Sequence, residues 1–271
     1  MNKFVFLHKR KLKIMRRTGG LKIRLILFAG IALFSLFKFY SNSEENKYTG
    51  KTQHISMTPN EEVRMGLRSA PSMAQQHGGL HPNNEYQALV DKVGNKLIAN
   101  SIALNSPYRY DFHLLRDPQS INAFALPGGQ VFITFALFSK LKSEAQLAGV
   151  LGHEIGHVLG RHSAERMAKQ GLTQGLITAV MTGGGGEAGQ MASMIGNMVN
   201  MKYGRQDELE SDELGVKFMI DAGYNPEEMI EVMKILKAAS GGKRVPEFQS
   251  THPDPENRIA NIKKAIKKYR K

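Results

Sequence analysis

The chain has 271 residues, with no cysteine and no tryptophan, and a formal net charge of +13 at pH 7. Residues 1–40 hold ten Lys and Arg and no acid, so the remainder carries only +3. This distribution, together with the lack of any nucleic-acid motif, argues against nucleic acid as a partner. Without cysteine, disulfides and thiolate ligands are excluded, and any bound metal must use His, Asp or Glu.

The N-terminal region is first basic and then apolar. Residues 1–24 carry most of its charge, and residues 25–40 include the apolar run LILFAGIALFSLF. A spanning helix needs about 20 residues, and Lys38 could snorkel so that the helix extends to that length. We expect residues 25–40 to be a retained transmembrane anchor, which the long basic flank favours, or a signal segment cleaved near Ser41–Ser43.

The same charge pattern predicts orientation and domain boundaries. The positive-inside rule places residues 1–24 in the cytoplasm and everything after Tyr40 outside it. Residues 41–57 are polar and predict a tether, and residues 58–271 are long enough to form one globular domain.

Local signals predict two helices and a strand at the start of this domain. Thr58, Pro59 and Glu61 are typical of a helix start, and we expect this helix to end near Ser69 because Pro71 follows. A second helix is expected from an Asn83 or Asn84 cap to about Asn100. Alternating apolar residues predict a strand over 108–115.

A hairpin is predicted around Pro127-Gly-Gly. Strand-like runs, residues 121–126 and 130–135, flank this turn. If the first run lies beside a catalytic site, its edge can pair with an extended peptide, which makes Asn122, Ala123, Phe124 and Ala125 candidate substrate-binding residues. An ordinary core hairpin is the alternative.

The strongest signal is SEAQLAGVLGHEIGHVLGRH, residues 143–162. Ser143 can cap a helix with Gln146 as the reciprocal partner, and the apolar spacing predicts burial. His153 and His157 then share one helical face, as two ligands of a zinc ion would. Glu154 can reach a water at that metal as general base. Two core histidines with no metal are the alternative.

The chain after this helix is rich in glycine and methionine, and then becomes helical again. Gly183–Gly186 predicts a mobile loop. The neighbouring methionines predict either a substrate groove or plain core; they are Met191, Met194, Met198 and Met201. Further helices are expected over 205–221 and 226–239. A basic helix then ends the chain, with a solvated face formed by Arg258, Lys263, Lys264, Lys267 and Lys268.

A catalytic zinc needs a third protein ligand. His162 lies nine residues after His153, about half a helical turn out of phase, so it should face away from the metal. Glu208 and Asp212 share a helical face, so Glu208 can bind zinc while Asp212 accepts a hydrogen bond from a ligand histidine. Spacing alone leaves Glu210, Glu213 or a solvated surface role open.

The segments HEIGH, ELESD, INAFALPGG and STHPDPENRI together resemble the gluzincin metallopeptidases of family forty-eight, which include the CAAX prenyl proteases. The resemblance implies an α+β fold, mainly helical and zincin-like, with a small β-sheet. It also implies one Zn²⁺ per chain, bound by His153, His157 and Glu208. Glu154 would be the general base, and Asp212 would support a zinc ligand.

The resemblance also covers Thr251-His252-Pro253. His252 would stabilise the oxyanion or occupy the open coordination position in a resting state, and Arg258 would orient this turn. A plain turn histidine is the alternative.

The resemblance implies a zinc metalloendopeptidase that acts on proteins or peptides, namely misfolded or misassembled proteins of a bacterial envelope. The catalytic domain would be periplasmic, tethered to the inner membrane. A prenylated substrate does not fit a chain with at most one span. The alternative function is a non-catalytic chaperone or adaptor with structural zinc, although Glu154 would then have no role. No particular oligomeric state is predicted.

Overall fold

The computed structural model describes residues 3–183, 204–239, 247–252 and 257–270. It divides into two compact units. The first contains the described parts of Met1–Glu44, His54–Ser56 and Met167–Asn200. The second contains those of Glu45–Gln53, Met57–Arg166 and Met201–Lys271. The described part is mainly helical with small sheets, which confirms the α+β prediction.

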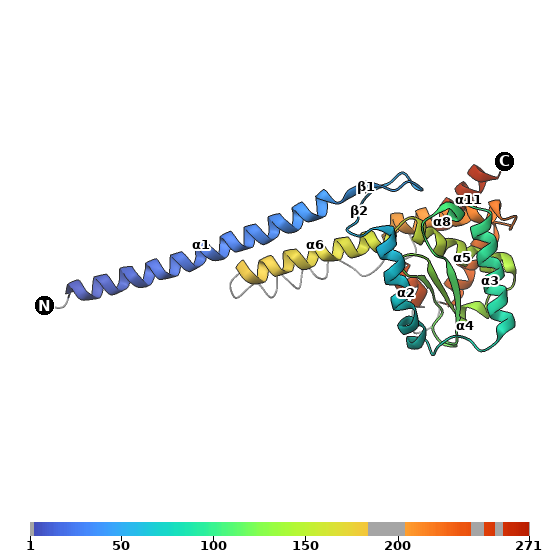
Figure 1. The fold of residues 1–271 in the computed structure, drawn as a ribbon, viewed down its shortest axis with the longest axis horizontal. Coiled ribbons are helices and arrows are strands. Elements are labelled where there is room, and N and C mark those ends of the chain that lie inside the picture. The colour runs from blue at the N-terminus through green and yellow to red at the C-terminus, as the bar shows by residue number, and fades with distance from the viewer. Residues whose placement is uncertain (1–2, 184–203, 240–246, 253–256, 271) are drawn as a thin grey trace. The chain divides into compact units, whose positions relative to one another are not determined.

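Helices of the second unit pack around a small sheet (Figure 1). The helices of this unit, including the short 3-10 helix η1, are α2 Pro59–Gln76, α3 Asn84–Ala99, η1 Ile102–Asn105, α4 Phe135–Phe138, α5 Glu144–Leu159, α8 Arg205–Asp221, α9 Glu228–Ala239, α10 Glu247–Thr251 and α11 Arg258–Tyr269. The strands are β3 Asp111–Leu115, β4 Ala123–Ala125 and β5 Gln130–Thr134, in the order β3-β5-β4.

The sheet contains the predicted hairpin. Strand β4 runs antiparallel to β5, with Phe124 opposite Phe132, and β3 runs parallel to β5. Gly128 and Gly129 turn the chain with φ of 83° and 113°. A side chain at Gly128 would also come within 2.5 Å of the Val63 nitrogen, so glycine is required there.

Two of the early helices differ in how well the sequence predicts them. The Asn83 side chain caps α3 by accepting from two backbone amides, as expected. The prediction that α2 stops before Pro71 is wrong, because the helix continues to Gln76. A proline removes only one helical hydrogen bond, and here the chain ends the helix later, at Gly78 and Gly79, which both have positive φ.

The residues expected to form a tether contain a short hairpin. Strands β1 Ser43–Glu45 and β2 Thr52–His54 pair with each other. The stretch Glu45–Gln53 belongs to the second unit. There Asn46 and Gln53 are buried, and they donate to the Leu159 and Gly160 carbonyls at 2.8 and 2.6 Å. These bonds fasten the hairpin to the end of α5.

The first unit contains α1 Lys3–Ser41 and the later part of α6 His162–Gly183. Within α1, Lys22–Ser41 is long and apolar enough to cross a membrane, judged by length and composition, and none of it is buried. The predicted Gly183–Gly186 loop, apart from Gly183, and the predicted groove methionines Met191, Met194, Met198 and Met201 lie outside the described residues.

Candidate metal centre

Helix α5 presents the first two candidate ligands from a buried position. The Ser143 hydroxyl accepts from the Gln146 amide at 3.2 Å, which fixes the start of the helix. The expected reciprocal bond is not made, because Gln146 accepts from Lys142 and donates to Glu228 instead. His153 and His157 lie one turn apart, and their Nε2 atoms are 3.0 Å from each other. Both side chains are buried.

Helix α8 brings the third candidate ligand onto the same point. It can approach α5 closely because Gly156 has no side chain; a Cβ there would lie 2.9 Å from the Ser211 Cα. Glu208 is thereby held with its carboxylate oxygens 3.4 Å from the Nε2 atoms of His153 and His157. The structure therefore brings together the three residues predicted as ligands.

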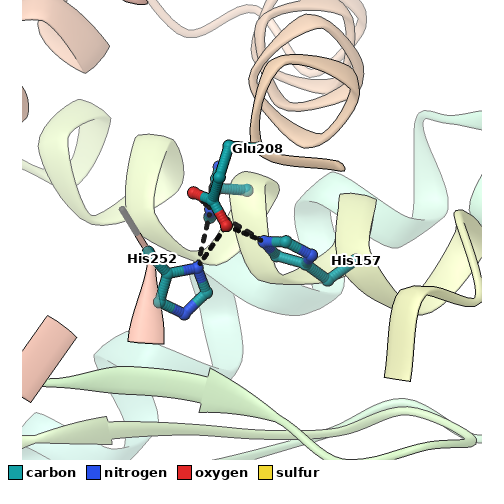
Figure 2. A group of neighbouring side chains, drawn as sticks. His157, Glu208 and His252 are labelled. Atoms are coloured by element: carbon teal, nitrogen blue, oxygen red, sulfur yellow. Dashed lines mark hydrogen bonds and ion pairs between the residues drawn. The ribbon is translucent and has the colours of Figure 1, made fainter. Parts of the chain in front are cut away.

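A fourth side chain joins this cluster from α10 and the residue that follows it. His252 stacks on Phe248 with ring centroids 4.4 Å apart. Its Nδ1 lies 3.1 Å from Glu208 Oε1 and 3.4 Å from His153 Nε2. Figure 2 shows the Glu208 carboxylate between the rings of His157 and His252.

The donor set fits a tetrahedral zinc ion. One atom from each of His153, His157, Glu208 and His252 lies within 4.8 Å of the others. Zinc–ligand bonds of about 2.0–2.2 Å imply ligand–ligand separations of roughly 3.3–3.5 Å. The contacts between these ligand atoms, 3.0 to 3.4 Å, are close to that range. Three imidazoles and a carboxylate are also ligands that zinc prefers.

His153 is supported from behind by a buried ion pair. Its Nδ1 donates to Asp212 Oδ1 at 2.8 Å, which leaves Nε2 directed at the cluster, where a metal would displace its proton. Asp212 in turn accepts from Arg258 Nε and Nη2 at 2.6 and 2.9 Å. Asp212 therefore lies where the sequence predicted. The prediction that Arg258 belongs to a solvated basic face is wrong, because the side chain is buried against Asp212.

His157 is supported by a different chain of contacts. Its Nδ1 lies 2.9 Å from His162 Nδ1, and His162 Nε2 lies 2.7 Å from Glu210 Oε2. If each ring donates outward, His157 keeps its Nε2 lone pair for a metal. His162 is not in the ligand cluster, as predicted, but its contact with His157 was missed. The signal that could have found it is the short spacing between these two histidines.

Lys51 connects the contacts behind His157, made by His162 and Glu210, to the β1–β2 hairpin. Its ammonium lies 2.8 Å from Asp207 Oδ1, 3.6 Å from Glu165 and 4.0 Å from Glu210. His162, Asp207 and Glu210 could themselves hold a cation. The Lys51 ammonium already supplies positive charge to these carboxylates, so we assign them to the support of His162.

The environments of the two α5 histidines shift their pKa values in opposite directions. Burial alone would lower the pKa of His153, but hydrogen bonds to Asp212 and Glu208 outweigh it and raise the pKa to about 9. For His157 burial prevails and holds the pKa well below its usual range. Burial would raise the pKa of Glu208, but His252 and the hydrogen bonds from His153 and His157 keep it well below normal.

Glu154 differs from every other carboxylate of the site. It is fully buried, and neither oxygen accepts a hydrogen bond within the described residues. His252 Nε2 lies 3.8 Å from Oε1. Burial raises the pKa of Glu154. Such a carboxylate is suited to accept a proton from a reacting group and to return it.

Strand β4 lies at the edge of the sheet and contacts α5. Ala123 and Ala125 are buried, and Phe124 stacks on Phe132 with ring centroids 4.9 Å apart. Among the described residues no strand pairs with the outer edge of β4. Within the described part of the chain, the buried Asn122 Oδ1 has no hydrogen-bond donor. The edge therefore has room for a further strand and an amide oxygen able to accept from it.

The sequence of this region matches a known protein family. Residues 84–266, more than half of the chain, match the model of Peptidase family M48. The chain belongs to this family. The M48 assignment confirms the resemblance noted from the motifs, and peptidases of this family are zinc-dependent.

Several relatives of this M48 chain carry protease names. It is 30% identical over 193 residues to the β-barrel assembly-enhancing protease of Escherichia coli, covering 67% of this chain and 39% of that protein. It is 28% identical over 258 residues to the mitochondrial metalloendopeptidase OMA1 of Saccharomyces cerevisiae, covering 90% of this chain and 73% of that protein. The chain thus spans about two fifths of the length of the bacterial relative.

Proposed function

We propose that this protein is a zinc metalloendopeptidase whose single Zn²⁺ is bound by His153, His157 and Glu208. The convergence of these three buried side chains beside the hydrogen-bond-free carboxylate of Glu154 is the observation that supports the proposal most strongly. A structural zinc site would have no use for such a carboxylate. Zinc, when bound, would polarise the scissile carbonyl and lower the pKa of a water to about 7.

Glu154 acts as the general base and then as the acid. Its carboxylate accepts a proton from the attacking water, and the raised pKa lets it hold that proton until the amine leaves. It returns the proton to the leaving nitrogen. Asp212 and His162 keep the rings of His153 and His157 oriented throughout, since each binds the outward ring nitrogen.

The substrate binds as an extended strand along the outer edge of β4. Backbone groups of residues 123–125 pair with the substrate backbone, and Asn122 Oδ1 accepts an N–H that it lacks in this structure. This mode recognises backbone more than side chains, which suits an enzyme acting on unfolded segments.

His252 occupies the position that a catalytic zinc site keeps open for water. Its Nδ1 lies among the ligand atoms, so the structure supports the resting-state role over the oxyanion role for this conformation. Movement of His252 out of the cluster then opens the site.

The protein acts in a bacterial envelope, and its substrates are misfolded or misassembled envelope proteins. Its relatives include a β-barrel assembly-enhancing protease and a mitochondrial metalloendopeptidase. The apolar part of α1 serves as the inner-membrane anchor, with residues 1–24 cytoplasmic and the domain of residues 58–271 periplasmic.

Zinc content and casein cleavage test the function in the full chain. Glu154→Gln should keep stoichiometric zinc and lose cleavage by about 10²–10⁴-fold, the usual contribution of a general base. Glu144→Gln is the matched control, because Glu144 lies at the exposed start of the same helix beside Lys92. It should behave like wild type.

A second arm tests the resting state. His252→Ala should retain zinc and cleave casein faster than wild type. Slower cleavage with zinc retained would instead assign His252 to the oxyanion. Zinc in every variant, with equal binding of unfolded protein and no cleavage in any, would support the chaperone alternative. Folded protein without zinc would refute the proposal.

A further inference from the structure

We propose that residues 171–183 of α6 lie inside the lipid bilayer, as a second membrane-embedded helical segment packed against α1. This inference rests on the proposal that α1 is a membrane anchor, and it is independent of the peptidase chemistry. The occupant of its outer surface is lipid acyl chain.

The first observation is a close helix–helix contact within the first unit. Gly171, Gly175 and Ala179 recur every four residues along α6. A Cβ on Gly175 would lie 2.8 Å from the Ser35 Cβ of α1, so the Gly175 backbone lies directly against the Ser35 side chain. Small residues at this spacing allow membrane helices to pack closely, where the hydrophobic effect gives no drive for association.

The second observation is the absence of charge. From Gly171 to Gly183 the helix contains no ionisable residue, whereas its preceding residues include Glu165, Arg166 and Lys169. The side chain of Met181 is 57% exposed, as are large apolar side chains of α1 such as Leu33 at 65%. The other exposed residues of this stretch, Gly171, Gln174, Thr178 and Thr182, are uncharged, so the helix surface avoids the largest cost of entering hydrocarbon.

The third observation is how the hydroxyl groups are satisfied. Thr173, Thr178 and Thr182 each donate to the carbonyl four residues earlier in α6, at 2.9, 2.8 and 2.8 Å. Ser35 of α1 does the same toward Ile31 at 2.8 Å. Exposed hydroxyls in water have no need of such bonds, but in hydrocarbon each must find a partner within the protein.

The direction of α6 sets how deep it reaches. It runs antiparallel to α1, with Met167 and Asn42 lining the same hollow and Gly175 against Ser35 further along (Figure 1). At about 1.5 Å per residue, Ser35 lies about 9 Å from the Ser41 end of the span. Thr178 lies about 5 Å deeper than Gly175, near the middle of a hydrocarbon core about 30 Å thick. The charge-free part of α6 therefore enters the bilayer without crossing it.

The absence of tryptophan from the chain allows a direct depth measurement. We would place the full chain in phosphatidylcholine–phosphatidylglycerol vesicles whose acyl chains are brominated near their middle. Thr178→Trp should show blue-shifted emission and strong quenching, similar to the α1 control Leu33→Trp. Leu104→Trp in η1, exposed in the second unit, should emit at a longer wavelength and be quenched little.

Unquenched, water-like emission from Thr178→Trp beside a quenched Leu33→Trp would overturn the inference. If neither probe is quenched, both this inference and the anchor are wrong. Neither result bears on zinc binding or cleavage, so failure here is distinguishable from failure of the peptidase proposal.

The absence of cysteine permits a second test of the contact itself. A Ser35→Cys, Gly175→Cys pair should form a disulfide when oxidised in the same vesicles. The control pair Ser35→Cys, Thr178→Cys should not, because Thr178 lies on the exposed side of α6. Equal cross-linking of both pairs, or of neither, would contradict the packing.

Discussion

The two histidines of α5 point the same ring nitrogen at the same carboxylate, yet they are supported in different ways. His153 is supported by a single charged acceptor, Asp212, which Arg258 neutralises within the core. His157 is supported by the ring of His162, and the nearest carboxylate on that side, Glu210, contacts His162 and not His157. Contact with Asp212 as well as Glu208 raises the pKa of His153, whereas for His157, which contacts Glu208 alone of these two, burial prevails and lowers the pKa. The difference shows that similar ligands can have different proton affinities.

The largest expected effect of this difference is on the pH dependence of zinc binding. With a pKa of about 9, His153 in the metal-free protein carries a proton that zinc must displace, and His157 does not. Zinc affinity should therefore fall by about tenfold per pH unit below 9, or about 100-fold between pH 9 and pH 7. Competition with a chelator of known affinity measures this, with one proton released per zinc at pH 7.5.

The same shift affects the stability of the metal-free protein. Because the folded pKa of His153 lies above its unfolded value near 6.5, the stabilisation is fully present below pH 6.5 and is lost as pH rises through 9. Both expectations depend on the raised pKa of His153. Zinc affinity that does not change between pH 7 and 9 would contradict that raised pKa.

The next largest effect is expected from Asp212→Asn. This change removes the charge that holds His153 and that pairs with the buried Arg258. Zinc affinity at pH 9 should drop by 10–100-fold, typical of losing a group that orients a metal ligand. Zinc affinity should also depend less steeply on pH, since only Glu208 then remains to raise the pKa of His153. Asp221→Asn, on the exposed end of α8 beside Lys217, is the control and should change neither quantity.

The smallest effect is expected from His162→Ala. It removes the acceptor behind His157 but leaves no charge unpaired next to the ligand, so we expect a loss of about tenfold in zinc affinity. Zinc affinity should still fall by about tenfold per pH unit, as expected for one displaced proton, because His153 is unchanged. His162→Asn, which can still accept from His157, should recover part of the affinity. If His162→Ala changed the slope as Asp212→Asn does, the two networks would not be distinct.

Prediction from the sequence succeeds best for a helix whose own residues contain the caps, the apolar spacing and the motif that identify it. Helix α5 has a cap, an apolar period and the HEIGH motif, and α8 places Glu208 and Asp212 on one face by spacing alone. Arg258 could not be placed in this way, because a basic residue in the amphipathic α11 fits a solvated face equally well. Only the contact between α11 and α8 determines its burial.

Other features were missed for the same reason, namely that they depend on contacts between segments that lie apart in the sequence. The register of α5 correctly excludes His162 from the ligands, but it cannot show that the turn at Arg161, with φ of 54°, brings the next ring onto His157. The burial of Asn46 and Gln53 likewise depends on the carbonyls at the end of α5, more than one hundred residues away. The local pattern of residue types within one segment does not show which distant segment that segment will contact.

A graded series along α8 tests the central claim most directly, that Glu208 is the third zinc ligand. Zinc affinity would be measured for Glu208→Gln, Glu210→Gln and Glu213→Gln in the full chain. Glu208→Gln should lose stoichiometric binding. Glu210→Gln should lose about tenfold, since Glu210 acts through His162. Glu213, which pairs with Lys268 at the surface, should have no effect. Wild-type affinity in Glu208→Gln, or an equal loss in all three variants, would contradict the account.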